Sequence, residues 1–162
     1  MFANKKSLGG ALCTLFAFGL ASRTPATQIP LPITIVSVAS PKVGNNSWRK
    51  AFEYLEEEGM LRHLRIANSR DPITLVPPST ASYRHVGLKL KLMSDGKHKF
   101  SYATGDLRKD LFNPVTCRAP SNHYGDEYGR LLLVVREQLK GFHLNELYLK
   151  RDTLKELTSD DG

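Results

Sequence analysis

Ser7 is the residue whose surroundings point most directly to chemistry. It precedes Leu8-Gly9-Gly10, which runs straight into an apolar segment ending near Ala21. A serine followed two places later by glycine, at the head of an apolar helix, is the second half of the G-x-S-x-G turn. That turn holds the serine Oγ clear of the backbone and points helix N–H groups at a developing oxyanion. The pattern therefore favours nucleophilic attack by Ser7 on a carbonyl carbon.

The N-terminal residues from Lys5 to Ser22 also fit a secretory signal peptide. Lys5 and Lys6 supply a positive n-region, residues 8–20 an apolar core, and Ala21-Ser22 a small-residue exit. The two lysines also stand where the first glycine of the turn and its neighbour would be, and a Lys5 side chain would crowd that turn. The rest of the sequence is needed to distinguish a nucleophilic Ser7 from a serine in a signal peptide.

Asp71 follows the second of two strands that the sequence predicts. Residues Ile33–Val38 are β-branched and mostly apolar, as in a strand buried on both faces of a parallel sheet. Residues 47–58 have apolar positions at helical spacing, and Leu61–Asn68 is the next predicted strand. Strand, helix and strand in this order indicate a right-handed βαβ unit. Asp71 then lies just past a strand end, where open α/β sheets place ligand-binding and catalytic groups.

The rest of the chain predicts an edge hairpin and two further helices. Residues 83–93 alternate apolar and polar side chains and turn at Asp95-Gly96 into a strand over residues 99–103. We expect a loop over residues 104–122, a helix from His123 to about residue 139, and a fraying charged helix from residue 145. The predicted fold class is α/β, with a mainly parallel sheet, flanking helices and an antiparallel hairpin at one edge.

Several packing expectations accompany this fold. The helix over residues 8–21 is apolar all round and should lie buried under the sheet. The acidic run at residues 56–58 should be a solvated helix end, and Gly87 should serve backbone geometry. No strand is expected upstream of Ser7. Because strand Ile33–Val38 needs neighbours on both sides, we expect it to leave a long unpaired edge.

Composition argues against several classes of function. The 162 residues carry a formal net charge of +7, but the 23 lysines and arginines are scattered in runs of no more than two. This distribution fits a generally basic surface, and without an aromatic-basic signature we expect no nucleic acid partner. No window reaches the roughly 20 apolar residues of a membrane span. Cys13 and Cys117 make no disulfide framework, and no Cys and His cluster has zinc-ligand spacing, so we expect no metal and no other cofactor.

Six short motifs occur in order between residues 7 and 130. They are S-L-G-G-A-L-C-T-L-F-A-F-G-L-A from Ser7, I-V-S-V-A-S-P-K-V-G-N from Ile35, R-I-A-N-S-R-D-P-I from Arg65, V-P-P from Val76, Y-R-H-V-G from Tyr83 and N-H-Y-G-D-E-Y from Asn122. In this order they resemble the C-terminal half of the class 3 lipases, the fungal-type triacylglycerol lipase family.

The resemblance implies an incomplete α/β-hydrolase fold and a catalytic triad in the order nucleophile, acid, histidine. Ser7, Asp71 and His123 each stand on the piece of sequence that resembles the family's motif for that role. By this resemblance His123 would take the Ser7 proton, Asp71 would fix the imidazole, and the Leu8 backbone N–H would supply one oxyanion donor. The missing half of the family's domain would carry the first strands, the lid and the loop with the other donor.

Four other histidines compete with His123 for the role of base. His63 would precede a strand at the surface, His98 would lie among lysines in a turn, and His143 falls beyond the family match. His85, in Y-R-H-V-G, resembles a position that the family keeps for structure and would lie on a strand. These placements favour His123.

The resemblance also implies an activity and partners. The activity would be that of a serine ester hydrolase on carboxylic esters of lipids, of the triacylglycerol lipase type and with a role in lipid catabolism. We expect residues 1–140 to be a truncated hydrolase domain, weak or inactive alone, and residues 141–162 to be a charged tail. Partners would be a lipid or other ester substrate, a transient membrane or lipid-droplet surface, and a second copy through the exposed sheet edge.

The alternative is a secreted, basic, non-catalytic binding module derived from the same fold. Localisation stays open: cytoplasmic if the N-terminus forms the turn and helix, secreted if it acts as a signal peptide.

Overall fold

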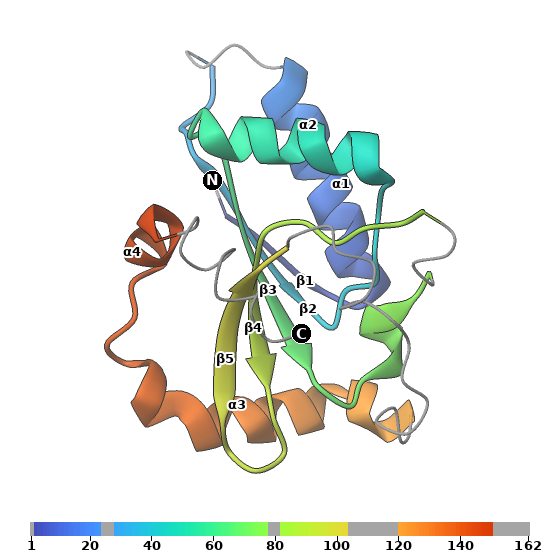
Figure 1. Ribbon diagram of the computed structural model, residues 1–162, viewed down its shortest axis with the longest axis vertical. Coiled ribbons are helices and arrows are strands. Elements are labelled where there is room, and N and C mark those ends of the chain that lie inside the picture. Colours follow the sequence, from blue (N-terminus) through green and yellow to red (C-terminus); the bar gives the residue numbers. More distant parts are fainter. Residues whose placement is uncertain (1, 24–27, 78–81, 104–119, 151–162) are drawn as a thin grey trace.

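The computed structural model describes residues 2–23, 28–77, 82–103 and 120–150. In chain order the elements are β1 (Phe2–Lys6), α1 (Leu8–Arg23), β2 (Ile33–Val38), α2 (Asn46–Glu57), β3 (Leu61–Asn68), the 3-10 turn η1 (Pro72–Leu75), β4 (Leu88–Leu92), β5 (His98–Tyr102), the 3-10 turn η3 (Pro120–His123), α3 (Gly125–Leu139) and α4 (Leu144–Leu149). In Figure 1, α2 crosses the upper part of the view and α3 the lower part, with the strands running between them.

The five strands form one sheet in the order β1-β2-β3-β4-β5. Strands β1 to β4 are parallel, and β5 runs antiparallel to β4 after a turn in which Gly96 has φ +80. Lys6, Val38 and Ile66 are partners across the sheet, so the C-terminal ends of the first three strands meet at one edge. The predicted α/β class, with its mainly parallel sheet and antiparallel edge hairpin, is confirmed.

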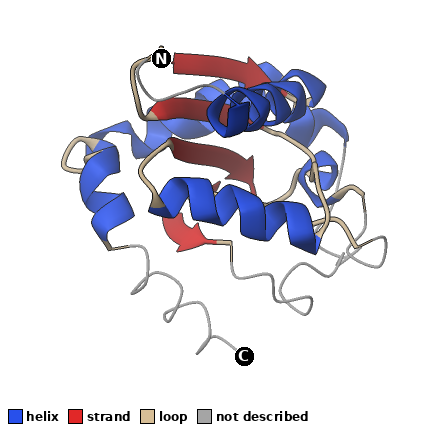
Figure 2. Ribbon diagram, turned by 90° about the horizontal axis from the view of Figure 1, so that it is seen from above, coloured by secondary structure: helices blue, strands red, loops and turns tan. Residues whose placement is uncertain are grey.

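Each face of the sheet has its own apolar core. On β2, Ile33 and Ile35 pack with Ala17 of α1 and Phe52 of α2. The core of the other face contains Ala39, Ile66, Leu90, Leu92 and, from α3, Tyr128, Leu131 and Val135. Because neighbouring strand residues point to opposite faces, α1 and α2 cover one face and α3 covers the other. Figure 2 shows these helices on both sides of the strands.

Strand β1 was not predicted by the sequence. Its residues Phe-Ala-Asn-Lys-Lys carry a weak strand signal, because asparagine and lysine are depleted in strands. Its pairing with β2, from Phe2 opposite Thr34 to Lys6 opposite Val38, depends on the sheet and not on local preference. The expected unpaired edge at β2 is therefore wrong, because β2 has a neighbour on each side. Among the described strands, β1 and β5 are the two edges of the sheet.

Helix α1 is apolar all round, but only one side of it is buried. The buried side is made of small residues: Gly10, Ala11, Thr14, Ala17 and Ala21. The other side exposes Leu8, Leu12, Leu15 and Phe16, each by between 42% and 66%. The expected burial under the sheet holds for one side of α1 only, because the sheet covers the side that faces it. No helix in the described ranges is long and apolar enough to cross a bilayer.

Helix α2 lies within one residue of the predicted range 47–58 at each end. Asn45 Oδ1 accepts a backbone N–H of the first turn at 2.9 Å, and Gly59 has φ +70 after the last turn. Glu56 differs from the expected solvated helix end, since it is only 6% exposed. Its carboxylate accepts hydrogen bonds from the hydroxyls of Tyr102 on β5 and Tyr148 on α4. The last turn of α2 therefore faces the interior on this side, because α4 and β5 cover it.

Strand β4 is shorter than the predicted strand over residues 83–93. Arg84 makes an isolated bridge to Gly44, and the chain then passes through Gly87, whose φ is +78. A Cβ at Gly87 would lie 2.6 Å from the His63 carbonyl oxygen, so this close approach requires glycine. The predicted role of Gly87 in backbone geometry is confirmed.

The C-terminal elements follow the predicted order with shifted ends. The helix predicted from His123 begins at Gly125, and η3 ends at His123. In α4, Leu147 is buried against Leu88 and Tyr102. Most of the loop predicted over residues 104–122 lies outside the described residues, as do Cys117 and the chain after residue 150.

Candidate active site

Ser7 lies in the turn between β1 and α1. Its backbone N–H donates to the Val38 carbonyl oxygen at 2.8 Å, which holds the turn against the end of β2. Ser7 has φ +55, in the left-handed region that non-glycine residues seldom adopt. Such strain persists where the surrounding structure enforces it, and it is often found at functional sites. The turn leaves Ser7 half-buried at the head of α1.

Gly10 allows α1 to start this close to the sheet. A Cβ on Gly10 would lie 3.1 Å from the Cβ of Ser40 and 3.2 Å from the Lys5 carbonyl oxygen. A Cβ on Gly9 would have the Lys5 Cβ as its nearest neighbour, at 3.4 Å. The expected crowding of the turn by Lys5 is wrong, because the Lys5 side chain is exposed and even a Cβ on Gly9 would make only ordinary van der Waals contact with it.

Asp71 lies between the end of β3 and η1, and its side chain is fully buried. Oδ1 accepts the Ile73 N–H at 2.8 Å, which caps η1. Oδ2 accepts from His123 Nδ1 at 2.9 Å and from the Tyr128 hydroxyl at 2.8 Å. Both oxygens of the carboxylate are therefore hydrogen-bonded, and the side chain is held in one orientation.

His123 lies between Ser7 and Asp71. Its Nδ1 is 2.9 Å from Asp71 Oδ2, and its Nε2 is 2.8 Å from Ser7 Oγ. A carboxylate only accepts hydrogen bonds, so Nδ1 carries the proton and Nε2 is free to accept the Ser7 hydroxyl proton. The His123 side chain is 18% exposed, while that of Asp71 is 0% exposed. The structure thus brings together the three residues that the sequence singled out, from segments up to 116 residues apart.

Leu8 is the first residue of α1, so its N–H belongs to the first turn of the helix. N–H groups of a first turn have no acceptor within the helix, and the helix dipole there favours negative charge. The Gly10 and Ala11 N–H groups donate to the Ser7 carbonyl oxygen at 2.9 and 3.3 Å. The first-turn donors that follow Ser7 directly are those of Leu8 and Gly9.

His85 and His63 are buried away from solvent and have other partners. His85 Nε2 donates to the Thr74 carbonyl oxygen at 2.6 Å, and burial is the main cause that lowers its pKa well below the usual value. His63 was expected at the surface, but it lies within β3 and is 2% exposed. That expectation is wrong because His63 faces α2, where its ring lies 5.9 Å from that of Phe52. His63 Nε2 is 2.8 Å from Ser37 Oγ.

The two remaining histidines also have other surroundings. His98 begins β5 and its Nδ1 lies 3.0 Å from Gln138 Oε1. His143 directly precedes α4. Of the five histidines, His123 is the one that the structure places against Ser7 and Asp71.

Two residues of this cluster were not singled out by the sequence. Tyr128 is 2% exposed, and its hydroxyl donates to Asp71 Oδ2 while accepting the Asn68 backbone N–H at 2.9 Å. Burial first, and the Asp71 charge second, raise the pKa of Tyr128 well above its usual value, so the hydroxyl stays protonated. Asn68 is 2% exposed at the end of β3. Both residues stand in the quoted motifs, but their roles depend on contacts across more than 50 residues of chain.

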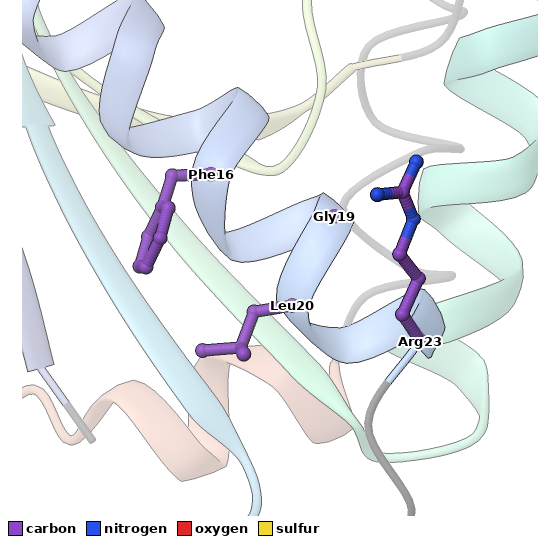
Figure 3. Close-up of a pocket in the computed structure, with 4 residues that line it drawn as sticks. All are labelled: Phe16, Gly19, Leu20 and Arg23. Atoms are coloured by element: carbon purple, nitrogen blue, oxygen red, sulfur yellow. The ribbon is translucent and has the colours of Figure 1, made fainter.

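A shallow hollow of about 330 Å³ lies farther along α1 (Figure 3). Phe16, Gly19, Leu20 and Arg23 line it. These residues follow Ser7 by 9 to 16 positions, and a helix rises about 1.5 Å per residue, so they lie roughly 14 to 24 Å from it along the axis. The hollow is therefore separate from the Ser7 cluster and is continuous with the exposed apolar side of α1.

Metal-binding chemistry finds no support in the part of the chain that the structure describes. Within those ranges there is no group of three or more His, Cys, Asp or Glu side chains that could hold an ion. Cys13 is a free thiol on α1.

Part of this chain is similar in sequence to a known protein family. A family model described as lipase (class 3) matches residues 6–81. Phospholipase A1-II 6 from Oryza sativa subsp. japonica is 37% identical over 93 residues, covering 53% of this chain and 22% of that protein. The galactolipase DONGLE, chloroplastic, from Arabidopsis thaliana is 32% identical over 107 residues, covering 53% of this chain and 22% of that protein. The chain spans about a fifth of the length of these curated relatives.

Solved structures show the same partial overlap. Lipase II from Rhizopus niveus superposes with a TM-score of 0.59 and 26% identity, covering 75% of this chain and 44% of that chain. A triacylglycerol lipase whose catalytic centre is formed by a serine protease triad gives a TM-score of 0.55 and 21% identity, covering 75% of this chain and 45% of that one. The described fold is thus part of a lipase-type α/β-hydrolase fold.

Proposed function

We propose that this chain, whose residues 6–81 belong to the class 3 lipase family, carries the nucleophile, base and acid of a serine ester hydrolase. The supporting observation is the hydrogen-bonded series from Ser7 to Asp71. Ser7 Oγ lies 2.8 Å from His123 Nε2, and His123 Nδ1 lies 2.9 Å from Asp71 Oδ2. These are the contacts that acyl transfer by a serine requires.

In the first half of the reaction, Ser7 becomes acylated. His123 Nε2 takes the hydroxyl proton as Ser7 Oγ attacks the ester carbonyl carbon. The carbonyl oxygen takes up the negative charge of the tetrahedral adduct, and the Leu8 N–H donates to it. Asp71 keeps the proton on Nδ1 and stabilises the positive charge of the His123 imidazolium. His123 then gives its proton to the alcohol oxygen as the carbon–oxygen bond breaks and the alcohol leaves.

In the second half, water releases the acid. His123 Nε2 accepts a proton from the water as its oxygen attacks the acyl carbon on Ser7. The second adduct collapses by breaking its bond to Ser7 Oγ, and His123 returns the proton to that oxygen. The products are a carboxylic acid and an alcohol, and Ser7, His123 and Asp71 regain their starting states.

A second oxyanion donor would come from another segment of a class 3 lipase domain. The described chain offers the first turn of α1, and its match to the curated relatives covers only about a fifth of their length. Removal of one oxyanion-hole donor costs on the order of 10²- to 10³-fold in turnover. We therefore infer that the 162-residue chain is weak or inactive alone.

The substrate class we propose is a carboxylic ester of a lipid. The similar proteins are described as phospholipases A1, a galactolipase and triacylglycerol lipases, and those activities share hydrolysis of a lipid carboxylic ester. Within that class the triacylglycerol lipase type is our proposal. The exposed apolar residues of α1 could contact a transient lipid surface. They lie along the helix that follows Ser7 and are not part of the Ser7 cluster itself.

Hydrolysis of short p-nitrophenyl esters tests this function. The 162-residue chain should show little turnover, whereas a chain extended by the N-terminal part of a class 3 lipase domain should turn over and lose activity on Ser7→Ala. If the extended chain is active and Ser7→Ala changes nothing, Ser7 is not the nucleophile. If the 162-residue chain alone works at ordinary enzyme rates, the inferred need for a further donor is wrong.

A further inference from the structure

Asn68 joins the turn that bears the acid to the segment that bears the base. Its side-chain Nδ2 donates to the Asn122 carbonyl oxygen at 3.1 Å. Its Oδ1 accepts the Arg70 N–H at 3.1 Å. One end of a single buried amide therefore holds the residue before His123, and the other end holds the residue before Asp71.

The backbone of Asn68 adds a second connection between the same parts. Its N–H donates to the Tyr128 hydroxyl at 2.9 Å, and that hydroxyl donates to Asp71 Oδ2 at 2.8 Å. Its carbonyl oxygen accepts the Asp71 N–H at 3.1 Å. The end of β3 thus contacts Asp71 in two ways, through the Tyr128 hydroxyl and directly through a backbone hydrogen bond.

We propose that Asn68 is a positioning residue that sets the separation of His123 Nδ1 from Asp71 Oδ2. This inference rests on the proposed function. Asn68 acts through the Asn122 carbonyl and does not itself contact Ser7, His123 or the ester. A neutral amide keeps its hydrogen bonds when His123 changes between imidazole and imidazolium, so the base stays in place through the proton transfers.

The physical reason for an asparagine is its pairing of one donor with one acceptor. The carbonyl oxygen of Asn122 needs a donor, and the N–H of Arg70 needs an acceptor. Asn68→Asp keeps the size of the side chain and the acceptor, but it places a carboxylate oxygen against the Asn122 carbonyl. Asn68→Ala removes both contacts and leaves the partly buried Asn122 carbonyl oxygen and Arg70 N–H without the Asn68 side chain as partner.

Proton NMR of His123 tests the positioning directly. In the unmodified chain, the Nδ1–H shared with Asp71 should give a separate, strongly deshielded resonance that exchanges slowly with water. We expect Asn68→Asp and Asn68→Ala to lose this resonance at neutral pH while the sheet amides keep their shifts. Asn45→Ala is the matched control: it removes a helix-capping asparagine from α2 and should leave the His123 resonance in place. Folded Asn68 variants that keep the resonance would overturn the proposal.

The rate of Ser7 labelling by a fluorophosphonate gives a second readout. We expect Asn68→Asp to slow labelling at least 10-fold and Asn45→Ala to change it less than twofold. If a chain extended by the N-terminal part of a class 3 lipase domain is not labelled but Asn68→Asp still abolishes the His123 resonance, the proposed function fails while the positioning role stands. If neither Asn68 variant folds, hydrogen exchange of the Asn68 side-chain amide in the unmodified chain decides: slow exchange of one Nδ2 proton supports the contact, and exchange at the rate of a free amide overturns it.

Discussion

Ser37 Oγ lies 2.8 Å from His63 Nε2, the same separation as between Ser7 Oγ and His123 Nε2. The surroundings of the two pairs differ. Ser37 is 0% and His63 is 2% exposed, and His63 Nδ1 has no hydrogen-bond partner among the described residues. His123 is partly exposed, and its Nδ1 faces Asp71. The Ser37–His63 pair is therefore a buried structural contact, and it serves as an internal control for the proposed nucleophile.

Burial of His63 should make the stability of this chain sensitive to acid. Burial first, and the Arg65 charge second, lower the pKa of His63 from 6.5 to about 3 in the folded chain. Between these values the unfolded chain binds a proton that the folded chain does not, so stability present above pH 6.5 is lost as the pH falls toward 3. We expect His63 alone to lower the free energy of unfolding by about 1.4 kcal/mol per pH unit. Urea unfolding at a series of pH values measures this slope.

The control for this prediction is a pair of histidine substitutions. His63→Gln replaces the imidazole beside Ser37 with an amide that does not titrate, so it should remove about one proton from the pH dependence of unfolding. His98→Gln replaces a histidine on β5 at the protein surface and should leave the slope unchanged. Equal slopes for the unmodified chain and His63→Gln would show that His63 is not the acid-sensitive group.

The sequence predicted the elements whose signals are local. Strand β2 is a run of β-branched residues, and α2 has a capping asparagine at one end and a glycine at the other, so both were found close to their observed bounds. Strand β1 was missed because Phe-Ala-Asn-Lys-Lys becomes a strand only through its pairing with β2. The burial of His63 and Glu56 was missed for a similar reason, because a charged or polar residue is read as exposed unless its partner is known.

The same difference between local signals and long-range contacts applies to the candidate site. Ser7, Asp71 and His123 stand on motifs that can be read one at a time, and the structure places their side chains within hydrogen-bonding distance. Asn68 and Tyr128 stand in the same motifs, but no local signal indicates which contacts they make. Their contacts join residues 54 to 60 positions apart, and no periodicity or spacing along the chain encodes them.

Tyr128→Phe should destabilise the fold measurably. The change removes the hydroxyl that donates to Asp71 Oδ2 and accepts the Asn68 N–H, and it leaves both groups buried. We expect a loss of about 1–3 kcal/mol in the free energy of unfolding, measured by urea denaturation. Tyr124→Phe is the matched control, since Tyr124 is 61% exposed, and it should change stability by less than about 0.5 kcal/mol. A Tyr128→Phe variant as stable as the control would contradict the role given to this hydroxyl.

The free edge of β1 and the exposed side of α1 should make the isolated chain self-associate. The unpaired edge of β1 offers backbone hydrogen bonds, and the exposed Leu12 and Phe16 of α1 offer apolar area. Sedimentation velocity should show dimers or larger species, and the double substitution Leu12→Glu and Phe16→Glu should shift them toward monomer. Leu133→Glu, on the exposed side of α3, is the control and should not. A monodisperse, cooperatively melting monomer of the unmodified chain would refute this prediction.

The most direct test of the central claim is the intact mass of the chain after treatment with a fluorophosphonate. We predict one adduct, located on Ser7, that is lost in Ser7→Ala and nearly lost in His123→Ala. Ser37→Ala should be labelled like the unmodified chain, because the Ser37–His63 pair is buried. Labelling that survives Ser7→Ala would contradict the assignment of Ser7, His123 and Asp71 as nucleophile, base and acid. A folded chain extended by the N-terminal part of a class 3 lipase domain that takes up no label at all would contradict it as well.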